Sequence, residues 1–340
     1  MKKLTISGGN NTSQLFIGED YQNFKKYLPQ KGQVIVLTDE KVRKLYGEAF
    51  KEYPIISIGQ TEQIKTLETI DAIIDQLISF KADRTSFLLA VGGGIVCDIV
   101  GFAASIYQRG IRFGFISTTL LSQVDASVGG KNGVNHRGFK NMIGVFNQPD
   151  FVICDPKMLQ TLGTEELSCG FAEIVKHTLI ADKAVFEWLE KNYTKAIALH
   201  PDAIEALVSN SVEIKATIVN KDEKEQGERK KLNLGHTYGH AVEKVMGVPH
   251  GYAVSIGLVF AARLSLQMGF LSGTDFQRIC SLLKNLNLPI TINGKKEEVL
   301  NALTMDKKKE GDTIQFILMK GLGEAVIRPM KISDLQSVEF

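Results

Sequence analysis

Apolar positions in the first half of the chain fall into short continuous runs and into longer runs with helical spacing. A short continuous run of apolar, often β-branched residues predicts a strand that is buried on both faces. Such strands are predicted at 34–38, 54–58, 86–91 and 113–117. Apolar residues that recur every three or four positions predict helices over 62–80 and 95–107. Strands that alternate with helices in this way predict a mainly parallel sheet with helices on both faces.

The pattern changes after a last clear strand at 151–155, where Pro156 suits the start of a helix. Most of the remaining chain has helical spacing. Helices are predicted at 165–181, 183–193, 201–220, 235–246, 252–268 and 274–286, and late strands at 313–319 and 324–327. The change of pattern predicts an α/β N-terminal domain over 1–155 and a mainly α-helical C-terminal domain over 156–340.

Composition restricts the class of protein. A chain of 340 residues is long enough for two domains. A hydrophobic content of 44% and a net charge of +2 suit a globular protein and give no sign of a nucleic-acid or membrane partner. The basic residues at the N-terminus are not followed by a long apolar stretch, which argues against a signal peptide.

The cysteines show no spacing typical of a zinc cluster or a disulfide framework. They are Cys97, Cys154, Cys169 and Cys280. We expect buried thiols in a reducing compartment, and therefore a cytoplasmic protein.

Half of the six histidines lie within fifteen residues, from His236 to His250. On a helix, His236 and His240 share one face, which Asn233 and Arg229 continue at i−3 and i−7. Apolar residues surround this polar stripe, and a polar stripe is costly to bury without partners. Spacing alone therefore favours a divalent metal held by His236, His240 and His250. The alternative, histidines that are satisfied within a core, explains the regular spacing of five polar residues less well.

A glycine run, Gly92–Gly94, stands between a predicted strand and a helix. Such a turn lets a dinucleotide pyrophosphate approach the backbone at a helix N-terminus. The signal is weak, because the spacing is not that of the common dinucleotide fingerprint. Asp98, one turn further on, suits either a hydroxyl of the cofactor or the dipole of the helix. Thr118 and Thr119 follow the next strand.

Two further features leave alternatives open. The segment 124–132 contains serine, glycine and lysine residues and predicts a loop that holds an anionic ligand, although a hydrophilic loop would look similar. Glu173 and Lys176 are three residues apart on a predicted helix. They suit either a surface ion pair of little weight or a metal ligand beside an anion contact.

Taken together, these segments resemble the 3-dehydroquinate synthase family over nearly the whole chain. The elements that carry the resemblance occur in one order, at 92–98, 101–104, 109–110, 118–121, 124–127, 129–131, 140–141, 170–176, 233–240 and 250–251. So many elements in one order are a specific signal. Ser117, where the family usually has proline, and a somewhat short segment between His240 and His250 are the two departures.

The resemblance implies a Rossmann-like NAD-binding domain and a mainly helical domain for metal and substrate. The implied reaction converts 3-deoxy-D-arabino-heptulosonate 7-phosphate into 3-dehydroquinate and phosphate, with transient oxidation by NAD and a final aldol closure. Such an enzyme is a carbon–oxygen lyase of the shikimate pathway, which leads to aromatic amino acids. It uses zinc or cobalt and acts as a homodimer.

The resemblance also assigns residues. It makes Glu173, His236 and His250 the metal ligands, and it makes His240 a proton-handling group instead of a ligand. The implied catalytic residues are His240, Lys176, Asp125 and Lys215. The implied cofactor contacts are Asp39, Glu62, Lys65, Gly93, Gly94, Asp98, Thr118, Thr119, Lys131, Lys140 and Thr161. The implied substrate contacts are Arg109, Asp125, Lys131, Asn141, Lys176, Lys215, Arg229, Asn233, His240 and Lys307.

The residue types fit a substrate with two anionic groups. Lys131, Lys176 and Lys307 are point charges for a phosphate, and either Lys307 or Lys308 is the lysine that takes part. Arg229 offers a planar fork for a carboxylate. Arg109 matches an arginine that reaches the phosphate across a dimer interface.

Three rival functions remain. Another sugar phosphate cyclase would act on a substrate without the carboxylate, so Arg229, Asn233 and Lys215 argue against it. A polyol dehydrogenase would release NADH and would not need the phosphate-binding lysines. A sensor without activity would have lost metal ligands or His240, and all of these are present.

Overall fold

The computed structural model describes residues 1–8, 11–292, 294–307, 313–336 and 338, and the side chains of all of these except 304–307 and 336. The chain forms two compact units. Unit 1 comprises Met1–Leu162 and Lys215–Lys224, and unit 2 comprises Gly163–Ile214 and Glu225–Phe340. Among the described residues, no helix combines the length and apolar character needed to cross a membrane.

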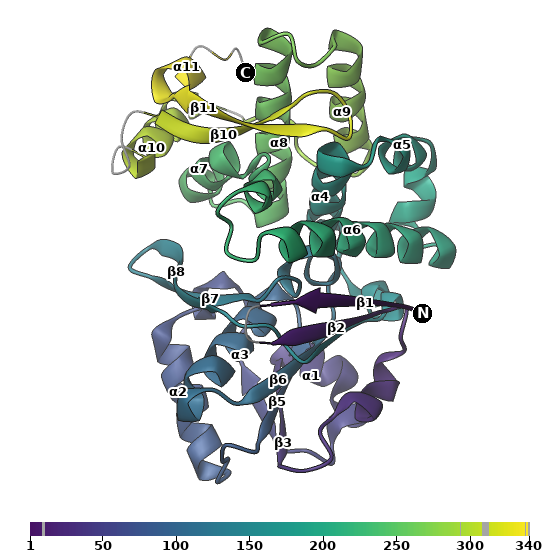
Figure 1. The fold of residues 1–340 in the computed structure, drawn as a ribbon, viewed down its shortest axis with the longest axis vertical. Helices are drawn as coiled ribbons and strands as arrows, with labels where there is room; N and C mark the ends of the chain where they lie inside the picture. The colour runs from purple at the N-terminus through teal and green to yellow at the C-terminus, as the bar shows by residue number, and fades with distance from the viewer. Residues whose placement is uncertain (9–10, 293, 308–312, 337, 339–340) are drawn as a thin grey trace. The chain divides into compact units, whose positions relative to one another are not determined.

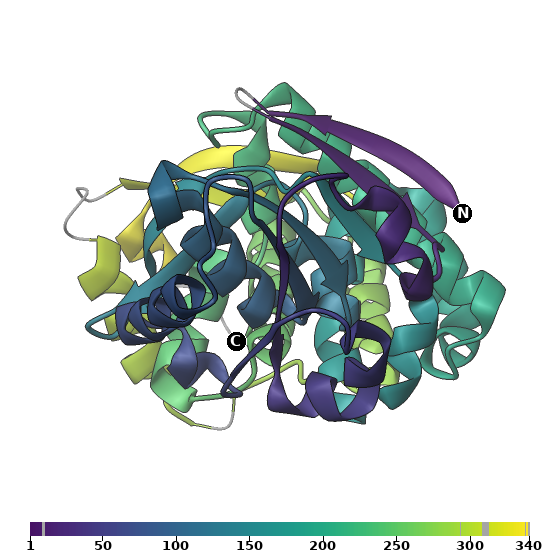
Figure 2. The same cartoon turned by 90° about the horizontal axis from the view of Figure 1, so that it is seen from below.

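A seven-stranded sheet forms the centre of unit 1 (Figure 1). Its strands, in spatial order, are β1 (Lys2–Ser7), β2 (Thr12–Ile17), β9 (Phe151–Cys154), β6 (Arg112–Ser117), β5 (Phe87–Gly92), β3 (Val34–Asp39) and β4 (Ile55–Ile58). Every neighbouring pair is parallel except β1 and β2, which Figure 2 shows side by side in purple. The predicted mainly parallel sheet is confirmed.

Helices cover both faces of this sheet. On one face α3 (Gly94–Ile106) packs against β5 and β6, with α2 (Leu67–Ser79) beside it. On the other face, η1 (Tyr21–Tyr27), α1 (Glu40–Tyr46) and η2 (Gly47–Phe50) enclose an aromatic core. The core includes the buried rings of Phe16, Phe24, Phe50, Phe87 and Phe151. Successive strand residues point to opposite faces, so continuously apolar strands fill both layers.

The segment predicted as one helix over 62–80 is divided. η3 (Glu62–Ile64) comes first, and α2 begins only at Leu67. Thr66 has an extended backbone, and its hydroxyl accepts a hydrogen bond from the Thr69 backbone N–H at 3.4 Å. The prediction was wrong over the first turn because a threonine N-cap takes the backbone out of the helical conformation. The other short helices of unit 1 are η4 (Tyr107–Arg109), η5 (Ser122–Ala126) and η6 (Pro156–Thr161).

A β-hairpin packs on α3, and it begins within the last two residues of the loop that the sequence predicted. It is formed by β7 (Lys131–His136) and β8 (Phe139–Phe146). Asp125 lies in η5 and Lys131 opens β7, so the predicted loop over 124–132 is wrong at both ends. Gly133 faces Gly144 across the hairpin, and a Cβ on Gly133 would lie 2.5 Å from the Ile143 carbonyl oxygen. Asparagine and glycine have low strand propensity, but the two glycines let the backbones of β7 and β8 pair at close distance.

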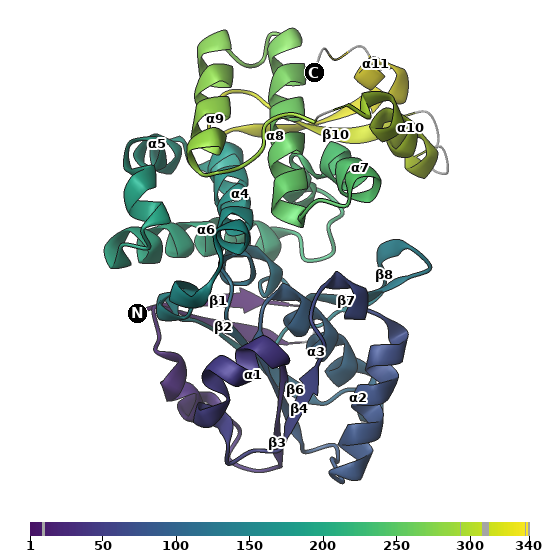
Figure 3. The ribbon, with the colours of Figure 1, turned by 180° about the vertical axis from the view of Figure 1, so that it is seen from behind.

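Unit 2 is mainly α-helical, as predicted. Its helices are α4 (Thr164–Ala181), α5 (Lys183–Ile197), α6 (Pro201–Lys221), which ends in unit 1, η7 (Glu228–Asn233), α7 (His236–Met246), α8 (His250–Gln267), α9 (Gly273–Asn285), α10 (Lys296–Lys307) and α11 (Ile332–Gln336). In Figures 1 and 3, α8 runs between α7 and α9, and it contacts both. A two-stranded sheet of β10 (Thr313–Met319) and β11 (Ala325–Lys331) packs against α8.

The polar stripe expected from Arg229 to His240 does not lie on one helix. Arg229 and Asn233 belong to η7, whereas His236 begins α7. Gly235 separates them with a φ of 80°, a left-handed conformation that glycine adopts without steric cost. The prediction of one continuous face was therefore wrong, because Arg229 and Asn233 lie on a separate turn that precedes α7.

The expected division at residue 155 falls inside unit 1, before η6. The structure changes units after Leu162 and returns to unit 1 for Lys215–Lys224. Lys215 therefore belongs to the unit that holds the parallel sheet, whereas the predicted range placed it in the helical domain. A boundary drawn from periodicity follows chain order, and it cannot detect a segment that rejoins an earlier unit.

Candidate metal and cofactor sites

Two histidines of unit 2 face one carboxylate oxygen of Glu173. Glu173 comes from α4, His236 opens α7 and His250 opens α8. Nε2 of His236 and Nε2 of His250 lie 3.6 and 3.5 Å from Oε1 of Glu173. Two ligands bound to one tetrahedral zinc ion at roughly 2.1 Å lie about 3.4 Å apart. The group therefore has the spacing of three ligands around one divalent cation.

The second ring nitrogen of each histidine faces an oxygen acceptor. Nδ1 of His236 lies 3.2 Å from the Leu234 carbonyl oxygen, and Nδ1 of His250 lies 3.4 Å from Oε2 of Glu243. A proton held at Nδ1 leaves the lone pair of a neutral imidazole on Nε2. Both rings are thus arranged to present Nε2 as a ligand atom on the side of Glu173.

Electrostatics at the two histidines differ. Burial opposes protonation of His250, but hydrogen bonds to Glu173 and Glu243 outweigh it and raise its pKa to about 9. Burial, assisted by the nearby Lys176 ammonium, lowers the pKa of His236 to about 3. His236 is therefore neutral at physiological pH, the form that coordinates metals. Without a metal His250 is therefore protonated at physiological pH, and a divalent cation bound beside Glu173 would take the place of the proton on Nε2.

Lys176 pairs with Glu173 inside unit 2. Its Nζ contacts Oε2 of Glu173, the carboxylate oxygen that does not face the histidines, and the two side chains are 2% and 0% exposed. Burial excludes the surface ion pair that the sequence left open. Desolvation offsets most of the attraction within a buried pair, so such a pair adds little net stability. A role in binding or catalysis explains the buried Lys176–Glu173 pair better than a role in stability does.

His240 lies one turn after His236 on α7, and it is exposed. Its ring centroid is 5.4 Å from that of His236 and 6.2 Å from that of His250. The group around Glu173 does not include it, so the trio chosen from spacing alone is not the one that the structure brings together. His240 instead forms a second possible cation group with Glu243 and His250.

Glycines allow the helices that carry Glu173, His236 and His250 to approach closely. A Cβ on Gly251 would lie 2.3 Å from Cα of Cys169, where α8 meets α4. A Cβ on Gly257 would lie 1.9 Å from the Gly235 carbonyl oxygen, where α8 meets α7. Backbone atoms cannot give way like the end of a flexible side chain. The separations of Glu173, His236 and His250 therefore depend on these contacts.

The expected substrate residues of unit 2 lie in different environments. Arg229 is among the largest fully buried side chains, with 2% exposure. Asn233 is half-buried, and its amide donates a hydrogen bond to Oε1 of Glu225. Lys307 ends α10, but its side chain lies outside the described residues, and so does Lys308. The prediction that one of these two lysines contacts phosphate is untested.

The glycine turn of unit 1 lies at the carboxyl end of β5. Gly93 is the N-cap of α3, and Gly94 is its first residue. A Cβ on Gly94 would lie 2.7 Å from Cβ of Ala126, and one on Gly93 would lie 3.0 Å from Cγ2 of Thr119. The Thr118 backbone N–H donates to the Gly92 carbonyl at 3.0 Å, which holds the adjoining turn after β6. The turn is closely packed and leads into a helix N-terminus, which favours an anion.

Lys65 contacts two of the other expected residues of unit 1. Its Nζ lies 2.5 Å from Oδ2 of Asp98 and 2.5 Å from Oδ1 of Asn141, and Lys65 is 4% exposed. Burial raises the pKa of Asp98, although Lys65 lowers it in part. Asp98 thus has a specific cationic partner, which the helix-dipole alternative did not anticipate. Asn141 has a φ of 49°, and its backbone N–H donates to Oδ1 of Asn135 at 2.8 Å.

Lys215 and Asp125 form a second buried pair in unit 1. Lys215 Nζ donates to Oδ1 of Asp125 and to its carbonyl oxygen, both at 2.6 Å. The two side chains are 9% and 20% exposed. Lys215 also acts on Asp98, whose pKa it lowers in part. The sequence placed these lysines and carboxylates far apart, and the fold gathers them in one unit.

The other expected residues of unit 1 are more exposed. Asp39 caps α1, because its carboxylate accepts from the Val42 N–H at 2.9 Å. Lys140 lies 3.8 Å from Oε1 of Glu62, and Thr161 exchanges a hydrogen bond with the Tyr46 hydroxyl at 2.9 Å. Lys131 and Arg109 are exposed as well. Gln108 and Arg109 have φ values of 53° and 69°, a strained turn of the kind found at functional sites.

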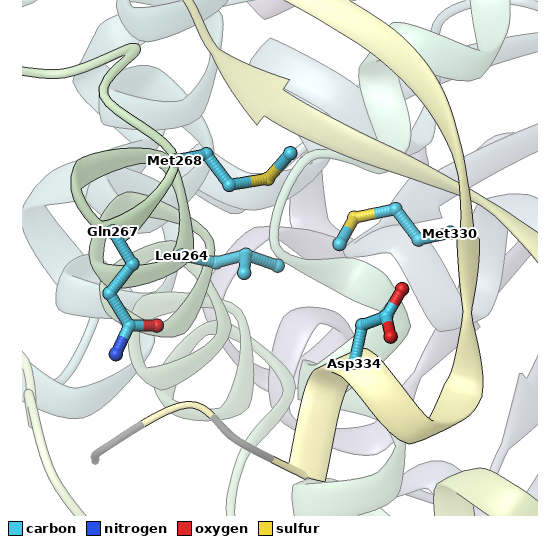
Figure 4. A pocket seen from close by; sticks show the side chains of 5 residues that line it. All are labelled: Leu264, Gln267, Met268, Met330 and Asp334. Atoms are coloured by element: carbon cyan, nitrogen blue, oxygen red, sulfur yellow. The ribbon is translucent and has the colours of Figure 1, made fainter.

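An open hollow of unit 2 has a different character (Figure 4). It lies between the end of α8 and the segment formed by β11 and α11. Its lining comprises Leu264, Gln267, Met268, Met330 and Asp334. This lining offers two thioethers, one amide and one carboxylate, and none of its members belongs to the groups described above. It contains no cationic side chain, so it does not suit a phosphate.

Glu243 is the residue that sequence reasoning missed. It lies seven residues after His236 and three after His240, so all three share one face of α7. That spacing was readable. The acceptor role was not, because His250 reaches Glu243 from a different helix.

Two family models match the chain. The model described as 3-dehydroquinate synthase N-terminal matches residues 55–169, and the model described as 3-dehydroquinate synthase C-terminal matches residues 170–309. A 3-dehydroquinate synthase from Hydrogenovibrio crunogenus is 42% identical, with 100% of each chain covered. One from Nitratiruptor is 47% identical over 81% of this chain and 79% of its own.

Solved structures agree on the fold. A 2-epi-5-epi-valiolone synthase from Streptomyces hygroscopicus, with NAD+ and Zn2+ bound, has a TM-score of 0.83 at 27% identity over 90% of each chain. A 2-deoxy-scyllo-inosose synthase complexed with carbaglucose-6-phosphate, NAD+ and Co2+ has a TM-score of 0.89 at 24% identity over 99% of each chain. The two-domain fold is therefore shared with sugar phosphate cyclases. The full-length similarity to curated relatives shows that the chain belongs to the 3-dehydroquinate synthase family.

Proposed function

We propose that this enzyme converts 3-deoxy-D-arabino-heptulosonate 7-phosphate into 3-dehydroquinate and phosphate, using the residues assigned below. The observation that carries the proposal is the convergence of His236, His250 and Lys176 on Glu173 inside unit 2. Such a group can hold a divalent metal next to a cation that receives a phosphate.

Glu173, His236 and His250 would hold the metal. Three protein ligands leave a coordination position open, as catalytic zinc requires. The valiolone synthase relative was solved with Zn2+ bound, which supports zinc as the metal of this enzyme. The 2-deoxy-scyllo-inosose synthase, which shares the fold, was solved with Co2+ bound. When bound, the metal would polarise the hydroxyl that is oxidised, and NAD would accept and later return the hydride.

Unit 1 would bind NAD. Gly93 and Gly94 allow backbone approach at the N-terminus of α3, where the helix dipole favours a pyrophosphate. The proposed contacts beyond the glycines are Asp39, Glu62, Lys65, Asp98, Thr118, Thr119, Lys131, Lys140 and Thr161. The NAD+ bound to the valiolone synthase relative supports this assignment.

The proposed substrate residues have matching charges. Lys176 and Lys131 would receive the phosphate, together with Lys307 from this chain and Arg109 from a second copy. Arg229 would form a bidentate contact with the carboxylate, assisted by Asn233. The side chains proposed for the remaining substrate contacts are Asp125, Asn141, Lys215 and His240.

Proton transfer falls to exposed or paired groups. His240 is exposed, so it can exchange a proton with a hydroxyl and with solvent. Lys215 holds Asp125 through two hydrogen bonds, which keeps both side chains oriented. Lys176 would stabilise negative charge on the departing phosphate.

Two rival activities remain measurable alternatives. The valiolone synthase relative shows that a cyclase of this fold can act on a different sugar phosphate, but the curated relatives with higher identity are 3-dehydroquinate synthases. Arg229 would serve the carboxylate that separates the substrates. A polyol dehydrogenase would accumulate NADH instead of recycling it.

Phosphate release tests the proposal. Purified protein with NAD and Zn2+ or Co2+ should release inorganic phosphate from the heptulosonate phosphate, without stoichiometric NADH. A chelator should abolish release, and added Zn2+ should restore it. Absence of release, or NADH that accumulates with turnover, would refute the assignment.

Substitution of Arg229 tests the substrate class. Arg229→Ala should raise the KM for the carboxylate substrate far more than it raises the Kd for NAD. Because Arg229 is buried, Arg229→Lys provides a variant that keeps the charge but loses the fork. Equal losses of substrate and NAD affinity in a folded Arg229→Lys protein would contradict the assigned role.

We also propose a cytoplasmic homodimer. All four cysteines are free and buried, which suits a reducing compartment. The exposed, strained turn at Arg109 suits a contact with a second copy. Sedimentation at several concentrations checks the dimer.

A further inference from the structure

We propose that Glu243 is a positioning residue, which holds His250 in the orientation and tautomer that bind the metal. This inference rests on the proposed function, because it requires the ion between Glu173, His236 and His250. Glu243 would not touch the metal or the substrate, and it would act through the imidazole of His250.

The geometry of His250 carries the proposal. Its Nδ1 lies 3.4 Å from Oε2 of Glu243, and its Nε2 lies 3.5 Å from Oε1 of Glu173. The ring therefore spans two carboxylates, one on each side. Glu243 is on α7, the helix that His236 begins, so one helix supplies both a ligand and the support of another ligand.

The support matters because a neutral imidazole has two tautomers. Only the tautomer with its proton at Nδ1 leaves a lone pair on Nε2 for a metal. A carboxylate at Nδ1 accepts that proton's hydrogen bond and disfavours the other tautomer, and it also makes Nε2 a stronger base. The Glu243 side chain is only 8% exposed, so little water competes with the contact.

His236 obtains the same support from a different source. Its Nδ1 faces the Leu234 carbonyl oxygen at 3.2 Å. A main-chain acceptor is fixed by the fold, whereas Glu243 can be replaced. The two ligands therefore differ in how far a side-chain substitution can disturb them, and Glu243 is the position where this contribution can be measured.

A competing arrangement makes Glu243 a ligand. His240, Glu243 and His250 also offer atoms within 4.8 Å of one another. An ion there would require Nδ1 of His250 as a ligand. The Glu173 group is favoured because both histidines direct Nε2 at one oxygen while acceptors occupy both Nδ1 sides.

Cobalt binding to the metal-free, full-length protein tests the proposal. Co2+ would be titrated against a competing chelator, and its visible d–d absorption recorded. Glu243→Gln should raise the Kd for Co2+ roughly 10- to 100-fold, the usual effect of losing such a support. Its d–d spectrum should also change. Wild-type protein should bind one Co2+ per chain.

Glu190→Gln provides the matched control. Glu190 is a partly buried carboxylate of unit 2 that pairs with Arg278 and belongs to neither cation group. The control should lower Tm but leave the Kd and spectrum of Co2+ unchanged. A Glu243→Gln protein with a Kd within threefold of wild type would overturn the proposal. An equal rise of the Kd for Co2+ in Glu243→Gln and Glu190→Gln would also overturn it. So would a wild-type protein that binds two Co2+ ions per chain and loses one of them in Glu243→Gln.

These outcomes are independent of the proposed activity. A wild-type protein that binds Co2+ tightly but releases no phosphate would refute the proposed function. The Co2+ titration of Glu243→Gln would still decide whether Glu243 positions His250. Phosphate release by wild type together with an unaffected Glu243→Gln protein would refute only the present inference.

Discussion

Gly251→Ala should loosen the metal group without changing any ligand. Gly251 follows His250 directly and lies where α8 meets α4. The added methyl carbon would stand 2.3 Å from Cα of Cys169 and 2.6 Å from its carbonyl oxygen. Both are backbone positions of α4, the helix that carries Glu173, so one helix has to move away from the other.

The size of the movement follows from these contacts. An ordinary contact begins at 3.4 Å, so α8 has to retreat by about 1 Å. A shift in the same direction at His250 would widen its 3.5 Å separation from Glu173 to about 4.5 Å. Two ligands of one ion cannot lie further apart than roughly 4.2 Å, twice a bond of 2.1 Å. Metal binding then has to reverse the shift, at the cost of overpacking, about 1–3 kcal/mol.

That cost corresponds to a roughly 5- to 140-fold weaker Kd for Co2+. Competitive titration measures it, and thermal unfolding of the metal-free protein measures the accompanying loss of stability. Gly273→Ala is the control, because Gly273 is the first residue of α9 and its added Cβ would meet open space. Unchanged Co2+ affinity in Gly251→Ala would refute the argument that close helix approach sets the ligand spacing.

Three further outcomes are expected. Lys65→Met should lower the free energy of unfolding in urea by about 3 kcal/mol, because Asp98 loses its cation in a largely buried pair. Lys51→Met removes an exposed pair and should change the free energy of unfolding little. Equal losses of stability in the two variants would contradict this reasoning. Burial raises the pKa of Cys97 to about 12 and also raises the pKa of Cys154. Neither thiol should therefore react with iodoacetamide until the protein unfolds. Labelling of Cys97 or Cys154 in the native protein, detected by mass spectrometry, would contradict this prediction. Treatment with a chelator should lower Tm when the protein was purified with Zn2+, and Zn2+ should restore it.

Much of the parallel sheet could be predicted because each buried strand is a continuous apolar run. The strands at 34–38 and 86–91 became β3 and β5 with shifts of one residue. The pairs β1–β2 and β7–β8 were not predicted. Their sequences are short and partly polar, and Gly133 pairs through close backbone approach, which leaves no hydrophobic pattern.

The candidate metal group was only partly readable. Spacing within one segment indicated His236 and His250, but it also selected His240, because periodicity cannot tell a ligand from a neighbour on the same face. Glu173 lies more than sixty residues earlier in the chain; its spacing from Lys176 left a surface ion pair and a metal ligand equally open, and only the family resemblance joined it to the histidines. Glu243 required the fold, since its partner lies on another helix.

The return of residues 215–224 to unit 1 means that the two units are not separable as contiguous genetic segments. A fragment that stops at Leu162 would lack Lys215 and its two hydrogen bonds to Asp125, and it would lack Asn220, which accepts from the Ser7 N–H at 2.9 Å. Exchange of unit 1 between relatives by a single crossover would therefore leave a mismatched stretch of α6 in every chimera. A chimera that keeps unit 1 intact needs three junctions, so that Met1–Leu162 and Lys215–Lys224 come from the same parent.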